Sequence, residues 1–70
     1  MARFVIADYD HESVTVRVTG IYEGCKVSVW IFEADNPDSV YVINNDVSTG
    51  SRITITTYDL KPKTDYIIWR

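Results

Sequence analysis

Apolar and polar residues alternate with a period of two along most of the chain, whereas a helical period is not found. Val14, Val16 and Val18 alternate with polar residues, and Ile53 and Ile55 do the same further along. Such alternation is typical of strands that bury one face. Three other segments are rich in β-branched or aromatic residues. Six strands are therefore predicted, at residues 4–7, 13–19, 26–33, 40–43, 52–56 and 65–70.

The segments between these strands are rich in Asp, Asn, Gly, Ser and Pro. Asp and Asn side chains bond their own backbone, Gly supplies a positive φ, and Pro fixes φ at the first turn position. Turns are predicted at residues 8–12, 20–24, 35–39, 44–46 and 48–51. The chain, residues 1–70, is expected to form a single all-β domain in which Asn44, Asn45 and Asp46 end the fourth strand.

Length and cysteine content limit how this domain is stabilised. A chain of 70 residues is expected to bury only about 60% of its unfolded surface. Cys25 is the only cysteine, so an internal disulfide and a zinc site built on several thiolates are excluded. The apolar share of 46% is sufficient for a core, so stability is expected from packing or from a partner.

The net charge and the hydropathy of the chain limit the classes of partner that can be expected. Seven Lys and Arg against ten Asp and Glu give a net charge of −3, without the basic block that tracks a phosphate backbone. No apolar run reaches the roughly 18 residues of a membrane span, and the start of the chain lacks the apolar region of a signal peptide. Nucleic acid and membrane are therefore not expected as partners, no targeting signal is found, and the localisation stays open.

A corner motif follows the fifth strand, with Leu60, Pro62, Thr64 and Tyr66 at alternate positions. Leu60 is expected to enter the core, Pro62 to stiffen the crossing, and the Tyr66 hydroxyl to bond a backbone group a few residues upstream. This segment resembles the fibronectin type III family of immunoglobulin-like β-sandwiches, whose fifth and sixth strands are joined in this way. The resemblance implies a small antiparallel β-sandwich.

The chain departs from that family at several points. The family carries a core Trp in its second strand, whereas here the Trp is Trp30 in the third predicted strand. Thr57 takes an inward position that is apolar in the family. Too few residues follow the corner for the seventh strand, and no Arg-Gly-Asp adhesion tripeptide is found. Integrin-type adhesion is therefore not expected.

Without a seventh strand, residues 65–70 are expected to form an open sheet edge with unpaired backbone groups. If Val27, Val29 and Ile31 face inward, large side chains of the third and last strands share the outer surface. The residues predicted to bind a partner in this way are Trp30, Phe32, Ile67 and Trp69. Two interpretations remain. The first strand or a loop covers this surface in a compact monomer, or a strand from another chain, such as a second copy's first strand, covers it by β-augmentation.

Catalytic, metal and cofactor sites are not expected. His11, the only histidine, lies in an acidic turn, but no second His or Cys completes a ligand set. Oxygen ligands for Ca²⁺ are offered by residues of two loops whose composition turn chemistry explains unaided: Asp35, Asp38, Asn44 and Asp46. Cys25 has no base partner in view and is interpreted as a strand-edge residue. No phosphate-binding glycine loop is found.

Three functions are compatible with these observations. The favoured one is a non-enzymatic structural or protein-interaction module that binds copies of itself or a larger structural protein by strand addition. A resemblance in fold to accessory domains of phage particles suggests a phage-like assembly as its setting. The alternative is a small acidic inhibitor of a host enzyme or of a nucleic-acid-binding protein. A barrel that stacks single-stranded nucleic acid has the aromatic residues here but lacks the basic groove.

Overall fold

The protein consists of six β-strands and no helix over residues 1–69, which the computed structural model describes. The strands are β1 (Arg3–Tyr9), β2 (Val14–Thr19), β3 (Lys26–Glu33), β4 (Val40–Val47), β5 (Arg52–Thr57) and β6 (Tyr66–Trp69). The prediction of an all-β chain with six strands is confirmed. No helix in the described residues could cross a membrane.

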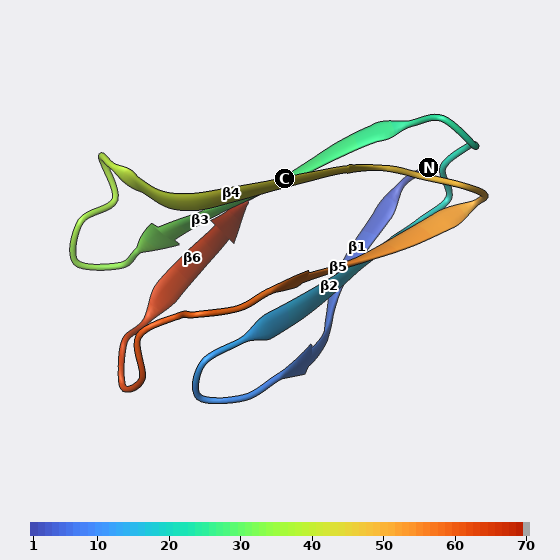
Figure 1. The fold of residues 1–70 in the computed structure, drawn as a ribbon. Helices are drawn as coiled ribbons and strands as arrows, with labels where there is room; N and C mark the ends of the chain where they lie inside the picture. Colours follow the sequence, from blue (N-terminus) through green and yellow to red (C-terminus); the bar gives the residue numbers. More distant parts are fainter. Residues whose placement is uncertain (70) are drawn as a thin grey trace.

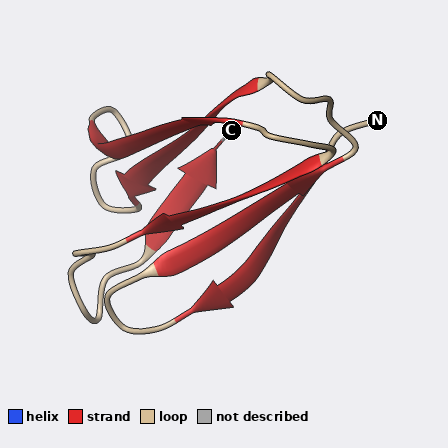
Figure 2. Cartoon of the chain, turned by 45° about the vertical axis from the view of Figure 1, so that its right-hand side comes forward, coloured by secondary structure: helices blue, strands red, loops and turns tan. Residues whose placement is uncertain are grey.

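The strands form two antiparallel three-stranded sheets that lie over each other as a small β-sandwich (Figure 1). Sheet A has the order β1-β2-β5, and sheet B has the order β4-β3-β6. Strands β4 and β5 contact each other at one margin of the sandwich. Strands β1 and β6 are the edge strands on the opposite margin, and the two layers are separately visible in Figure 2.

Between the sheets lies one apolar core, formed by alternate residues of the central strands. Val16 of β2 and Ile31 of β3 are almost completely buried, as the period-two pattern predicts. The other members come from the same two faces and from the corner: Val14, Val18, Val29, Ile53, Ile55 and Leu60. Side chains of both inner faces therefore interdigitate, which is the packing of a β-sandwich.

The predicted turn at Asn44, Asn45 and Asp46 is wrong, because β4 continues to Val47. These polar residues are paired within the sheet, opposite residues of β3. Asn45 Oδ1 accepts a hydrogen bond of 2.6 Å from the Ser28 hydroxyl on the neighbouring strand. Asn44 Nδ2 donates to Thr57 Oγ1 of the other sheet at 2.6 Å. For Asn44 and Asn45, cross-sheet and cross-strand partners thus replace the local backbone bonds that Asn makes in turns, whereas Asp46 keeps a local bond from the Val47 N–H.

The inward position of Thr57, which departs from the family pattern, is accounted for by the same hydrogen bond. Thr57 is 2% exposed, and its hydroxyl accepts from Asn44 across the space between β5 and β4. A buried hydroxyl costs free energy unless it is hydrogen-bonded. Asn44 and Thr57 therefore act as one polar pair that joins the two sheets at the β4 and β5 margin.

Candidate partner-binding surface

The four residues predicted to bind a partner lie together on the outer face of sheet B. Val29 and Ile31 are buried in the core, so the alternate residues Trp30 and Phe32 point away from it. In the β3–β6 ladder, Trp30 is paired with Trp69 and Phe32 with Ile67. Directly paired residues of antiparallel strands share a face. The structure therefore brings Trp30, Phe32, Ile67 and Trp69 onto one surface.

The two tryptophans of this surface contact each other. The centroids of the Trp30 and Trp69 rings are 6.0 Å apart, and the ring planes are 88° to each other. This edge-to-face geometry is a favourable arrangement for aromatic pairs. Trp69 is nevertheless 61% exposed, and Ile67 is 46% exposed. The two rings pack against each other, while much of the Trp69 surface remains in water.

Sequence reasoning missed two members of the surface, which come from β4. Val40 is paired with Phe32, and Ile43 with Trp30, in the β3–β4 ladder. Both side chains are 39% exposed. The sequence shows an apolar fourth strand, but it carries no signal for which strand lies beside β3. The apolar surface, here called the outer patch, therefore comprises Trp30, Phe32, Val40, Ile43, Ile67 and Trp69.

The two outer faces of the sandwich differ in charge. The six outer-patch residues include no charged side chain, and Lys26 is the charged residue of β3 on that face. On the outer face of sheet A, arginine and threonine alternate, with Arg17 and Thr19 on β2 and Arg52 on β5. Depletion of charge is typical of the centre of a protein interface. Sheet B, and not sheet A, therefore carries the candidate interface.

The outer patch reaches the open edge of sheet B. Strand β6 pairs with β3 on one side, and no described strand pairs with it on the other. The outward residues Ile67 and Trp69 belong to this edge strand. Unpaired edges are templates for strand addition, and proteins commonly protect them with Lys, Pro or a bulge. None of these devices lies within Tyr66–Trp69.

The corner before β6 positions this edge strand. Leu60 is buried, and its N–H donates to the Glu12 carbonyl at 2.8 Å, which ties the corner to the turn between β1 and β2. The Tyr66 hydroxyl accepts from the Lys61 N–H at 2.8 Å, which is the kind of upstream backbone bond that the motif predicts. The Thr64 hydroxyl donates to the Pro62 carbonyl at 3.2 Å. The start of β6 is thereby fixed relative to the core.

An ion pair reinforces the corner from sheet B. Lys61 Nζ lies 2.8 Å from Glu33 Oε1 and 5.4 Å from the centre of the Tyr41 ring. The hydrogen bond to Glu33 raises the pKa of Lys61. The Tyr41 ring in turn lies 5.5 Å from that of Tyr66. Three side chains from different strands and the corner thus meet around Tyr66.

The Tyr66→Phe substitution is expected to lower the free energy of unfolding by about 1 kcal/mol, because it removes the hydrogen bond to the Lys61 N–H. In a chain of this length, that loss corresponds to a fall of about 4–8 °C in the unfolding temperature. Thermal unfolding followed by circular dichroism measures it. Tyr22→Phe is the matched control, since Tyr22 is 84% exposed. Equal unfolding temperatures for the two variants would show that the corner bond adds no stability.

The acidic turn around His11 is solvated. His11 Nε2 lies 3.3 Å from Glu12 Oε1, and both side chains are exposed. The hydrogen bond from the Glu12 N–H to Asp10 Oδ1, 2.8 Å long, lowers the pKa of Asp10. Asp10 and His11 line an open depression together with residues of the corner. Within residues 1–69, no cluster of three or more His, Cys, Asp or Glu is arranged to hold a metal ion.

The oxygen ligands considered for Ca²⁺ do not converge. Asn44 is bonded to Thr57, and the Asp46 carboxylate accepts from the Val47 N–H. Asp35 and Asp38 lie in the loop between β3 and β4, at the opposite end of β4 from Asp46. Cys25 is half-buried beside β3, and its N–H donates to the Ser48 hydroxyl. The four oxygen-bearing side chains are therefore not gathered at one site.

The chain was compared with protein-family models, with curated proteins and with solved structures, and none of the three comparisons found a match.

Proposed function

We propose that this protein is a non-enzymatic structural or protein-interaction module that assembles with other protein chains through the outer patch and the open edge of β6. The observation that carries the proposal is the continuity of the outer patch across all three strands of sheet B up to an unpaired edge. Monomeric proteins rarely expose contiguous apolar patches beyond a few hundred Å². Burying about 400 Å² of it would contribute on the order of 10 kcal/mol before association costs.

The strand order supports a relationship with the immunoglobulin-like and fibronectin type III β-sandwiches. In that architecture the first, second and fifth strands share one sheet, and the third and sixth lie in the other. Here β1, β2 and β5 form sheet A, and β3 pairs with β6 in sheet B. The last strand of the architecture would pair with β6 on its open side. The Tyr66 hydroxyl bond at the corner supports the same relationship.

The partner we propose is a second copy of the chain or a larger structural protein, as in a phage-like particle. This setting is suggested by likeness of fold to accessory domains of such particles. The acidic-inhibitor alternative has less support, because the carboxylates of residues 1–69 are divided among β1, β3, β4 and the loops. In addition, the outer face of sheet A carries Arg17 and Arg52. Assembly through apolar side chains is expected to persist at high salt, unlike binding by exposed charges.

Trp69→Glu is expected to abolish assembly of the purified protein, because it places a charge in the centre of an apolar contact. Sedimentation velocity at increasing protein concentration, in low and high salt, measures the effect. The matched control is Thr54→Glu, which adds the same charge to the exposed outer face of sheet A. A parent protein that sediments as a monomer, like the Trp69→Glu variant, would contradict self-assembly through this surface and leave only a larger protein as the proposed partner.

A further inference from the structure

A second apolar surface, distinct from the outer patch, lies on the inner side of β1. Ile6 is paired with Val16 and Tyr9 with Val14, and both valines point into the core. Because paired residues share a face, Ile6 and Tyr9 also face the space between the sheets. Ile6 is nevertheless 53% exposed and Tyr9 is 77% exposed. Within residues 1–69, the middle and the end of the inner face of β1 are therefore largely uncovered.

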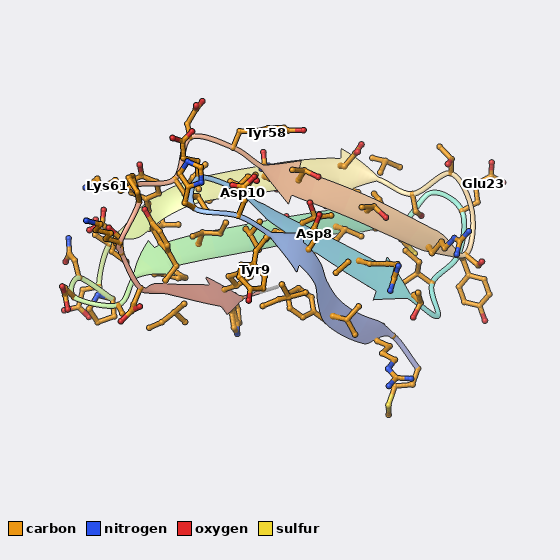
Figure 3. All side chains as sticks on the ribbon, turned by 90° about the horizontal axis from the view of Figure 1, so that it is seen from below. Asp8, Tyr9, Asp10, Glu23, Tyr58 and Lys61 are labelled. Atoms are coloured by element: carbon orange, nitrogen blue, oxygen red, sulfur yellow. The ribbon has the colours of Figure 1, made fainter. Side chains whose placement is uncertain are left out.

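This uncovered face lies on the same margin of the sandwich as the open edge of β6. Sheet A ends at β1 and sheet B ends at β6, while β4 and β5 meet at the opposite margin. Figure 3 looks onto the sandwich with β1 and β6 along one margin and Tyr9 labelled between them. A strand added to β6 would extend sheet B beneath β1. We call the space bounded by the β6 edge and the inner face of β1 the slot.

We infer that the slot binds an extended, uncharged segment of another protein chain, which pairs with β6 and packs its alternate apolar side chains against Ile6 and Tyr9. The inference rests on the proposed function in that both use the edge of β6. Beyond the proposed function, the inference specifies that the partner segment is extended and that its apolar residues alternate. Main-chain hydrogen bonds give affinity in such strand addition, and pockets for alternate side chains give specificity.

The lack of charged side chains on the described inner faces of the slot favours an uncharged partner segment. On the inner faces, Phe4, Ile6, Tyr9 and Ile68 carry no charge. Among the charged residues of this margin, Asp10 and Lys61 line the open depression at the corner end, whereas Arg3 and Asp8 of β1 are paired with outward threonines of β2. The slot is also continuous with Ile67 and Trp69 of the outer patch. Both faces of an incoming strand would therefore meet apolar side chains, and only its ends would meet charges.

Interface size favours an extended segment over a second folded copy in the slot. Stable interfaces between folded proteins use about 20–30 residues a side. Edge-to-edge pairing of two copies of β6 joins only the four residues Tyr66–Trp69 of each, with few neighbours. An extended segment instead places its whole length between β6 and β1, so that its backbone and both rows of side chains are in contact.

A synthetic peptide of alternating valine and threonine, with a lysine at each end for solubility, tests the inference. Calorimetric titration into the full-length protein at monomeric concentrations is expected to show binding. Hydrogen exchange is expected to show new protection of those β6 amides that do not bond to β3. In Ile6→Ser, which loses an apolar contact of the slot, affinity is expected to fall at least tenfold. Val5→Ser, on the outer face of β1, is expected to change it less than twofold.

No binding at millimolar peptide, or equal affinity of Ile6→Ser and the parent, would overturn the inference. Equal affinity would place the peptide on the outer patch or on the edge alone. Since the titration is made on the monomer, its result is independent of the sedimentation experiment with Trp69→Glu. Failure of self-assembly would contradict a second copy as the partner in the proposed function and would leave the peptide result fully interpretable.

Discussion

Ile31→Ala is expected to lower the free energy of unfolding by about 3–4 kcal/mol, because Ile31 is completely buried between the sheets. The truncation leaves a cavity among β-branched side chains of both sheets, whose stiff rotamers limit collapse around it. A domain of this size has a total stability of only about 4–10 kcal/mol. The loss corresponds to a fall of about 12–32 °C in the unfolding temperature, measured by calorimetry or circular dichroism.

Two further variants serve as controls for the predicted effect of Ile31→Ala. Ile67→Ala removes the same atoms from a β6 position that is 46% exposed, and it is expected to cost less than about 1 kcal/mol. Ile31→Val removes one methylene group and is expected to cost about 0.5–1.5 kcal/mol, so it remains measurable if Ile31→Ala does not fold. Similar losses for Ile31→Ala and Ile67→Ala would contradict the assignment of the two faces of sheet B.

Ser48→Ala is expected to cost about 2 kcal/mol, because the Ser48 side chain joins the loops at one end of the sandwich. Ser48 is 2% exposed, and its hydroxyl donates to the Tyr22 carbonyl at 2.5 Å. The same oxygen accepts from the Cys25 N–H at 3.0 Å. Alanine removes both of these bonds and leaves the two backbone groups only the longer bond of 3.3 Å from the Cys25 N–H to the Tyr22 carbonyl. A part-buried backbone group that loses its partner costs about 1–3 kcal/mol when it is not rehydrated.

The measurement for Ser48→Ala is the unfolding temperature together with hydrogen exchange at the Cys25 amide. We expect a fall of about 8–16 °C and a faster exchange of that amide. Ser51→Ala is the matched control, because Ser51 is exposed and bonds Ile21 through its backbone carbonyl, which the substitution keeps. Unchanged protection of the Cys25 amide in Ser48→Ala would show that the hydroxyl is not its main partner.

The buried and in-strand positions of several polar residues could not be predicted from the neighbouring sequence. Ser48 and Thr57 are buried, and Asn44 lies within a strand, although the composition around Asn44 predicts a turn. Turn propensity predicts the structure at an Asn correctly only where the side chain forms its most favourable hydrogen bond with the neighbouring backbone. In this fold Asn44 finds Thr57 across the sheets. That partner is distant in the sequence, so no local pattern contains it.

Sequence alone determined the class of fold, the approximate strands, the inward faces of the central strands and the corner before β6. These features follow from period-two alternation and from turn chemistry, which act between residues a few positions apart. The alternation of apolar and polar residues indicates which residues of one strand share a face. For this reason Trp30 and Phe32 could be assigned to the face opposite Val29 and Ile31. The same parity placed Ile67 and Trp69 together on β6.

Tertiary structure decided which strands are neighbours and which faces remain uncovered. The order β4-β3-β6 adds Val40 and Ile43 to the outer patch, and the order β1-β2-β5 leaves Ile6 and Tyr9 beside an open edge. The physical reason is that strand order is set by long-range packing of two sheets around one core. The apolar pattern of a strand is the same whichever strand lies next to it.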